Sequence, residues 1–188
     1  MYRTDKQLKE VTDDTRFERS EKPSGGWNLL RRMTIDAPSD HLYDFYADPR
    51  NLAEIYGHFA TVEPVEADVT GWTVKLPMVP NLQWQSEIVH REPGKSLSWA
   101  SKPGGSLETQ GRISFAPAPA GQGTEVTLYV RYDPPAGPLG DLALSMATAA
   151  PKVISDKALR RFKSLVETGE IATTAGQPAG RSDGRDKK

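Results

Sequence analysis

Residues Pro138 to Glu167 read PLGDLALSMATAAPKVISDKALRRFKSLVE and carry two apolar stripes with the spacing of an α-helix. The first stripe comprises Leu139, Leu142, Ala143, Met146 and Ala147, and the second comprises Ile154, Ala158, Phe162, Leu165 and Val166. Apolar side chains at these intervals share one face of a helix. Because such a face must be buried, we expect a broad apolar surface elsewhere in the chain for this helix to lie on.

Pro151 separates the two stripes. Proline lacks a backbone N–H, and its ring clashes with the carbonyl four residues earlier, so the sequence predicts a kink or a break there. As the first residue of a restarted helix, the same proline costs little. Gly169 follows the last periodic residue and is the expected end of the helix.

Most of the preceding chain has the two-residue period of half-buried strands. The expected strands are residues 27–36, 59–67, 71–76, 82–90, 96–101, 108–116 and 124–133. The turns between them are short, including a tight turn over Glu92–Lys95, which implies an antiparallel meander. Two short helices are predicted after the first strand. Ser39 or Asp40 is the expected N-cap of the first, and Asp48 that of the second, with Pro49 in its first turn.

These elements predict an α+β fold. In it, a curved seven-stranded antiparallel sheet wraps around a long C-terminal helix, with the two short helices after the first strand. One helix cannot fill the concave side of such a sheet, so we expect a cavity between them. The domain is predicted to cover residues 25–168. Residues 1–24 are expected to be a disordered or loosely ordered arm, and residues 169–188 a flexible tail.

The composition argues against several classes of function. The chain has no cysteine, which excludes disulfides and zinc–thiolate sites, and its three histidines lack metal-ligand spacing. A net charge of -1 does not favour nucleic acid as a partner. No apolar run approaches the roughly 20 residues of a membrane span, and the N-terminus lacks a secretory signal. We expect a cytoplasmic protein without a metal site or another cofactor.

Four phrases carry a family resemblance: TIDAPSDHLYDFYADPRNLAEI (34–55), WQSEIVHREPGKSLSWAS (84–101), GRISFAPAPAGQGTEVTLYVRYDPPAGPLG (111–140) and LRRFKSLVETGEI (159–171). Together with the order of the elements, they resemble the polyketide cyclase/dehydrase and coenzyme-Q-binding START-like branch of the SRPBCC superfamily. The resemblance implies the helix-grip fold and a central cavity, in which relatives bind lipids, quinones, sterols or polyketides. Some relatives, such as the aromatase/cyclases, also catalyse reactions there. None of the four phrases is a catalytic signature.

The candidate cavity residues share the inward faces of the strands or the first helical stripe: Trp72, Leu76, Trp84, Trp99, Phe115, Leu128, Val130, Tyr132, Leu142 and Met146. The three tryptophans lie on successive strands. They either fill the core or offer flat apolar walls to a ring or an isoprenoid chain. The expected rim of the cavity comprises Tyr46, Tyr56, Phe59 and Met78.

Polar candidates for chemistry are few. Tyr132 lies on an inward face and is the one weak candidate for a catalytic acid, the alternative being core packing with a hydrogen bond to the backbone. Arg112 and Arg131 are expected on the outer surface. The three histidines are expected to have surface or structural roles.

The sequence therefore favours a domain that binds a small apolar or amphipathic ligand. The first alternative is a polyketide cyclase/dehydrase acting in the same cavity, which requires an acid or base with a tuned pKa. The second is a stress or assembly protein acting through its surface. The basic face of the last helix leaves open a weak peripheral contact with anionic lipid headgroups. The oligomeric state is not determined by the sequence.

Overall fold

The computed structural model describes residues 27–75, 81–133 and 150–171. Seven strands form one antiparallel sheet in the order β1-β7-β6-β5-β4-β3-β2. Their bounds are β1 (Trp27–Ile35), β2 (Thr61–Glu66), β3 (Val69–Val74), β4 (Leu82–Glu92), β5 (Ser96–Ser101), β6 (Glu108–Pro117) and β7 (Thr124–Asp133). The strands from β2 to β7 are neighbours in both chain and sheet, and β1 pairs with β7. The predicted seven-stranded antiparallel sheet is confirmed.

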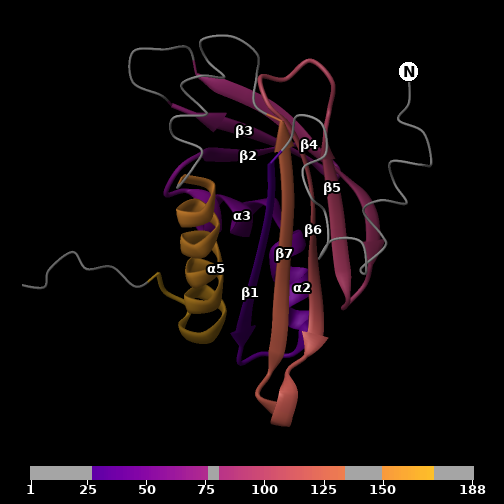
Figure 1. The fold of residues 1–188 in the computed structure, drawn as a ribbon, viewed down its shortest axis with the longest axis vertical. Coiled ribbons are helices and arrows are strands. Elements are labelled where there is room, and N and C mark those ends of the chain that lie inside the picture. Colours follow the sequence, from indigo (N-terminus) through magenta and orange to yellow (C-terminus); the bar gives the residue numbers. More distant parts are fainter. Residues whose placement is uncertain (1–26, 76–80, 134–149, 172–188) are drawn as a thin grey trace, which may run out of the picture.

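Three α-helices occur in the described part of the chain: α2 (Ser39–Ala47), α3 (Pro49–Tyr56) and α5 (Ala150–Thr168), with a short 3-10 turn, η1 (Pro119–Gly121), between β6 and β7. Figure 1 shows α5 running beside β1, with α2 and α3 behind β1 and β7. The strands β2 to β4 cross above the helices, so the sheet curves around them (Figure 1). This is the predicted α+β helix-grip arrangement. Within the described ranges, no helix is long and apolar enough to cross a membrane.

The C-terminal helix begins where the sequence predicts a restart. Helix α5 starts at Ala150, and Pro151 stands in its first turn, where the missing N–H has no intrahelical partner to lose. Gly169 ends the helix with a φ of 73°, and its N–H donates to the carbonyl of Leu165 at 2.9 Å. The first stripe, residues 139–147, lies outside the described residues.

Helix α5 also covers the edge of the sheet at β1. The Lys163 Nζ donates to the backbone carbonyl of Thr34 at 2.8 Å, and the backbone N–H of Asp36 donates to Glu167 at 2.8 Å. An uncovered edge strand offers unpaired backbone groups to other chains. The polar side of α5 thus protects the β1 edge while its apolar side enters the core.

Two local details of the fold differ from the predictions. Helix α2 begins at Ser39 with Pro38 as its N-cap and no side-chain cap, so the expected cap by Ser39 or Asp40 is wrong. The reason is that Asp40 turns toward the β4–β5 turn, where its Oδ1 occupies the space that a Cβ on Gly94 would need. A tight turn at Asp68, with a φ of 63°, also starts β3 earlier than predicted, at Val69.

The predicted cap of α3 is confirmed. The Asp48 carboxylate accepts the backbone N–H of Arg50 at 2.8 Å, and Pro49 occupies the first turn.

The predicted turn between β4 and β5 is confirmed as well. There the N–H of Lys95 donates to the carbonyl of Glu92 at 2.9 Å, and Gly94 supplies the required positive φ of 70°.

We expect Asp48→Ala to lower the free energy of unfolding by about 1 kcal/mol, because it removes an N-cap. Hydrogen bonds from the Arg50 side chain and backbone hold the pKa of Asp48 below its ordinary value. The contribution is therefore complete above the unfolded pKa of about 4 and is lost as the pH falls through the lower, folded pKa. Denaturant melts at neutral and acid pH measure it. Asp44→Ala, at an exposed carboxylate on α2, is the control, and an equal loss there would contradict the capping role.

Candidate functional site

A cavity of about 590 Å³ lies between the sheet, α3 and the first turns of α5. Its lining comes from every strand except β2: β3, β4 and β5 supply aromatic and aliphatic side chains, and β1, β6 and β7 supply residues on the opposite side. Apolar atoms dominate this lining. The cavity predicted from one helix on a curved sheet is therefore present in the structure.

Three tryptophans form the wall on the sheet side. Trp72 and Trp84 are direct cross-strand partners, and their rings are stacked 5.8 Å apart with an angle of 3° between their planes. The Trp72 Nε1 donates to Ser86 Oγ at 2.8 Å, so its polar group is satisfied within the wall. Trp99 on β5 pairs with Gly111 on β6, whose missing side chain leaves room for the indole. This wall offers flat aromatic faces to a bound molecule.

A pair of tyrosines stands on the helical side. The hydroxyls of Tyr46 on α2 and Tyr56 on α3 are 2.7 Å apart, and both side chains line the cavity. Burial raises the pKa of Tyr56 to about 12, and burial together with the neighbouring Tyr56 holds the pKa of Tyr46 well above its ordinary value. Both phenols therefore keep their protons at neutral pH.

Tyr132 contributes a hydroxyl on the β7 side. It lines the cavity with Val130 of the same strand and with its cross-strand partner Thr109. The side chain is half-buried, and burial raises the pKa of its hydroxyl. This hydroxyl has no hydrogen bond to any other described residue.

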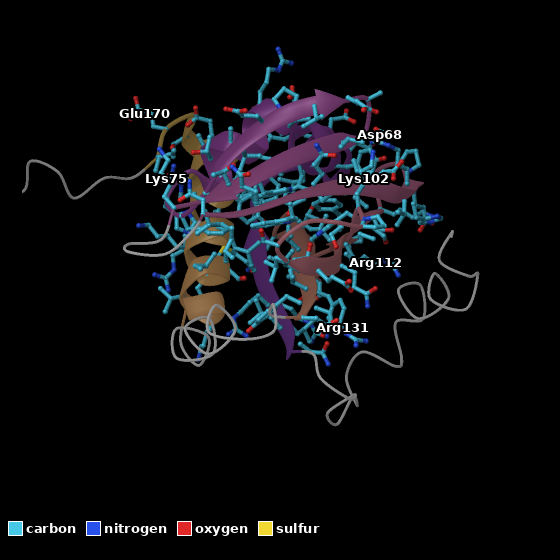
Figure 2. The ribbon with its side chains drawn as sticks, turned by 90° about the horizontal axis from the view of Figure 1, so that it is seen from above. Asp68, Lys75, Lys102, Arg112, Arg131 and Glu170 are labelled. Carbon is cyan, nitrogen blue, oxygen red and sulfur yellow. The ribbon has the colours of Figure 1, made fainter. Side chains whose placement is uncertain are left out.

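A charged pair stands at the β2–β3 end of the cavity. The β4 strand has an irregularity at Val89 that brings Arg91 opposite the buried Leu97, which turns the guanidinium toward the inner face. Arg91 and Asp68 form an ion pair, and both line the cavity. Figure 2 shows Asp68 and Lys75 toward opposite sides of the view, and β3 (Val69–Val74) connects them along the chain. Lys75 also lines the cavity, so charged groups stand at both ends of an apolar interior.

His58 follows α3 and also lines the cavity. Its Nδ1 lies 3.2 Å from the carbonyl oxygen of Ile55, which fits an Nδ1–H donor. Partial burial lowers the pKa of His58, and the positive charges of Lys157 and Arg161 lower it further. The imidazole is therefore neutral at pH 7 and can accept a proton.

The structure brings most of the sequence-predicted residues together. Five of the candidate cavity residues line the cavity, namely Trp72, Trp84, Trp99, Val130 and Tyr132, and so do three of the four rim residues, Tyr46, Tyr56 and Phe59. Leu76, Met78, Leu142 and Met146 lie outside the described residues. That the lining residues bind a ligand stays a prediction.

Two expected cavity residues do not line it. Phe115 and Leu128 are buried in the main core, with the Phe115 ring 6.3 Å from that of Tyr43. They have the correct inward orientation, but they lie toward the end of the sheet that α2 covers, so protein side chains fill the space beside them. Arg112 and Arg131 do not line the cavity either, and Figure 2 shows both on the side of the molecule away from α5.

Other lining residues were not predicted from the sequence, among them Arg91 and His58. Regular alternation along β4 places His90 inward, and only the irregularity at Val89 turns Arg91 to that face. No pattern in the sequence indicates this irregularity. His58 could have been found, because it is next to Phe59, which was expected at the rim. Among the described residues, no group of three or more His, Asp or Glu side chains could hold a metal ion.

Comparisons with known proteins agree with this geometry. Residues 27–167 match the model of the family described as polyketide cyclase / dehydrase and lipid transport. No curated protein sequence matches the chain. The crystal structure of DR_A0006 from Deinococcus radiodurans is similar, with 29% identity, a TM-score of 0.60, and coverage of 77% of this chain and 100% of that one.

Two more distant structures share the fold alone. The Zhui aromatase/cyclase from Streptomyces sp. R1128 has 17% identity, a TM-score of 0.61, and coverage of 78% of this chain and 99% of that one. TTHA0849 from Thermus thermophilus has 19% identity, a TM-score of 0.58, and coverage of 74% and 97%. The fold, the cavity and the family match over residues 27–167 lead to one conclusion: the chain belongs to the polyketide cyclase/dehydrase and lipid transport family of the SRPBCC superfamily.

Proposed function

We propose that the protein binds a small apolar or amphipathic molecule, such as a lipid, a quinone or a polyketide-like compound, in the cavity between the sheet and the helices. The observation that carries this proposal is the cavity itself. Its volume of about 590 Å³ suits a small-molecule ligand, and its lining is mostly apolar with few polar groups. Such a lining supports affinity through apolar burial, at roughly 25 cal/mol per Å².

Native mass spectrometry of freshly expressed protein tests the proposal directly. We expect an additional mass that organic extraction removes and that corresponds to a lipid or a quinone. Titration of the extracted protein with 2-methyl-1,4-naphthoquinone should then quench the emission of the tryptophans in the wall. Trp99→Leu should weaken this binding, whereas Phe115→Leu, in the core beside the cavity, should not. Absence of both a retained ligand and quinone binding would contradict the proposal.

The second candidate function is a cyclase/dehydrase acting in the same cavity. The observation in its favour is that a neutral imidazole, His58, and a protonated phenol, Tyr132, both line the cavity. An aldol-type cyclisation requires a base to remove a proton next to a carbonyl and an acid to protonate the carbonyl oxygen. These two side chains are the groups that would fill those roles.

Tyr132→Phe separates binding from catalysis. If the cavity only binds, the variant should change the affinity for the naphthoquinone by at most about tenfold, the effect of one neutral hydrogen bond. We expect no turnover of polyketide-like substrates by the unmodified protein. Turnover that disappears in Tyr132→Phe and in His58→Gln, with binding retained, would establish the enzyme instead.

A further inference from the structure

We propose that the hydroxyls of Tyr46 and Tyr56 form a donor site that selects ligands with a carbonyl oxygen over hydrocarbons of the same shape. This inference rests on the proposed binding function of the cavity and specifies the ligand class. It distinguishes ketones, quinones and esters from pure hydrocarbons.

The hydroxyls of Tyr46 and Tyr56 carry one proton each. The two hydroxyl oxygens are 2.7 Å apart, so one proton lies in the bond between them. The second proton has no acceptor among the residues that the structure describes. The side chains of Tyr46 and Tyr56 are only 6% and 8% exposed, so bulk water does not readily supply one. A buried donor without a partner is costly, and the pair therefore requires an acceptor that is not among these residues.

The described aromatic neighbours of the pair do not supply that acceptor. The ring of Tyr46 packs against Trp99 and Phe162, with centroid distances of 6.3 and 5.5 Å. The ring of Tyr56 packs against Trp72, with a centroid distance of 5.3 Å. These aromatic neighbours offer no strong hydrogen-bond acceptor. Both tyrosines also line the cavity, from which a ligand can supply the acceptor.

The protonation state of the two tyrosines determines which kind of ligand group they bind. Because burial raises the pKa of both tyrosines, neither becomes a phenolate at neutral pH. The pair thus presents a proton, and an oxygen with free lone pairs, such as a carbonyl, complements it. A hydrocarbon bound in this place leaves the proton unpaired, and sites built around a hydrogen bond reject such analogues.

Two probes of the same shape test the proposal. 2-Methyl-1,4-naphthoquinone carries two carbonyl oxygens, and 2-methylnaphthalene has the same fused rings without them. The chain has no cysteine that could add to the quinone. The test variant is the double change Tyr46→Phe and Tyr56→Phe, because in a single variant the remaining hydroxyl can turn toward the ligand. Tyr129→Phe, at a buried tyrosine of β7 that does not line the cavity and whose hydroxyl donates to Asn28 Oδ1, is the control.

Dissociation constants come from isothermal titration calorimetry. In the double variant we expect the naphthoquinone to bind about threefold to tenfold more weakly, while the naphthalene binds equally well or more tightly. Tyr129→Phe should leave both constants unchanged. Equal changes for both probes, or none, would overturn the donor site but not the binding function. Failure of both probes to bind the unmodified protein would instead overturn the binding function, and with it this inference.

Discussion

Phe162→Ala should lower the free energy of unfolding by about 3–5 kcal/mol, the typical cost of truncating a buried phenylalanine. Phe162 is in the middle of the second apolar stripe of α5 and is 0% exposed. Its ring stacks on Phe45 with a centroid distance of 5.8 Å and lies 5.5 Å from Tyr46. The truncation therefore opens a void between α5 and α2. A loss of this size is a large share of the stability of an ordinary domain.

Urea melts of the two proteins measure this loss. Val153→Ala is the control on the same helix, because Val153 is 61% exposed and its truncation should change stability by no more than about 0.5 kcal/mol. A change below about 1 kcal/mol for Phe162→Ala would mean that α5 does not bury its stripe against the sheet and α2.

The fold could be predicted because its signals are local and repeated. Alternation along each strand identifies the inward face, and the helical spacing of Ala158 and Phe162 identifies the buried side of α5. Asp48 and Gly169 mark helix ends through chemistry that acts within a few residues. The cap of α2 could not be predicted in this way. Asp40 there has a tertiary neighbour, the turn at Gly94, that is remote in sequence and overrides its capping tendency.

The candidate site was predictable only in part. Alternation assigns Trp84 and Leu128 alike to the inner face, but it does not tell which inward side chains border empty space. That depends on how far each helix reaches along the sheet. Regular alternation also fails at Val89, where one irregular residue in β4 brings Arg91 to the inner face. The tyrosine pair depends on two helices meeting at one point, which no period in the sequence encodes.

Gly111→Ala should be a disruptive single-methyl change, because it adds a side chain beneath the tryptophan wall of the cavity. A Cβ at Gly111 would overlap Cζ2 of Trp99 and would lie 2.7 Å from the backbone carbonyl oxygen of Tyr129. That carbonyl belongs to β7, which pairs with β6 along its whole length, so it cannot move freely. The indole must give way instead. Overpacking of this kind typically costs about 1–3 kcal/mol.

The displaced indole makes this variant a test of function as well as of stability. Trp99 lines the cavity, so Gly111→Ala should weaken quinone binding and shift the tryptophan emission, although residue 111 itself does not line the cavity. Gln110→Ala, the neighbouring position on β6, should change neither property. Combining Gly111→Ala with Trp99→Leu should recover part of the lost stability, because the smaller side chain removes the clash with the ring and leaves only that with the carbonyl. If Gly111→Ala melts and binds like the unmodified protein, the indole does not rest on Gly111, and the tryptophan wall is arranged differently.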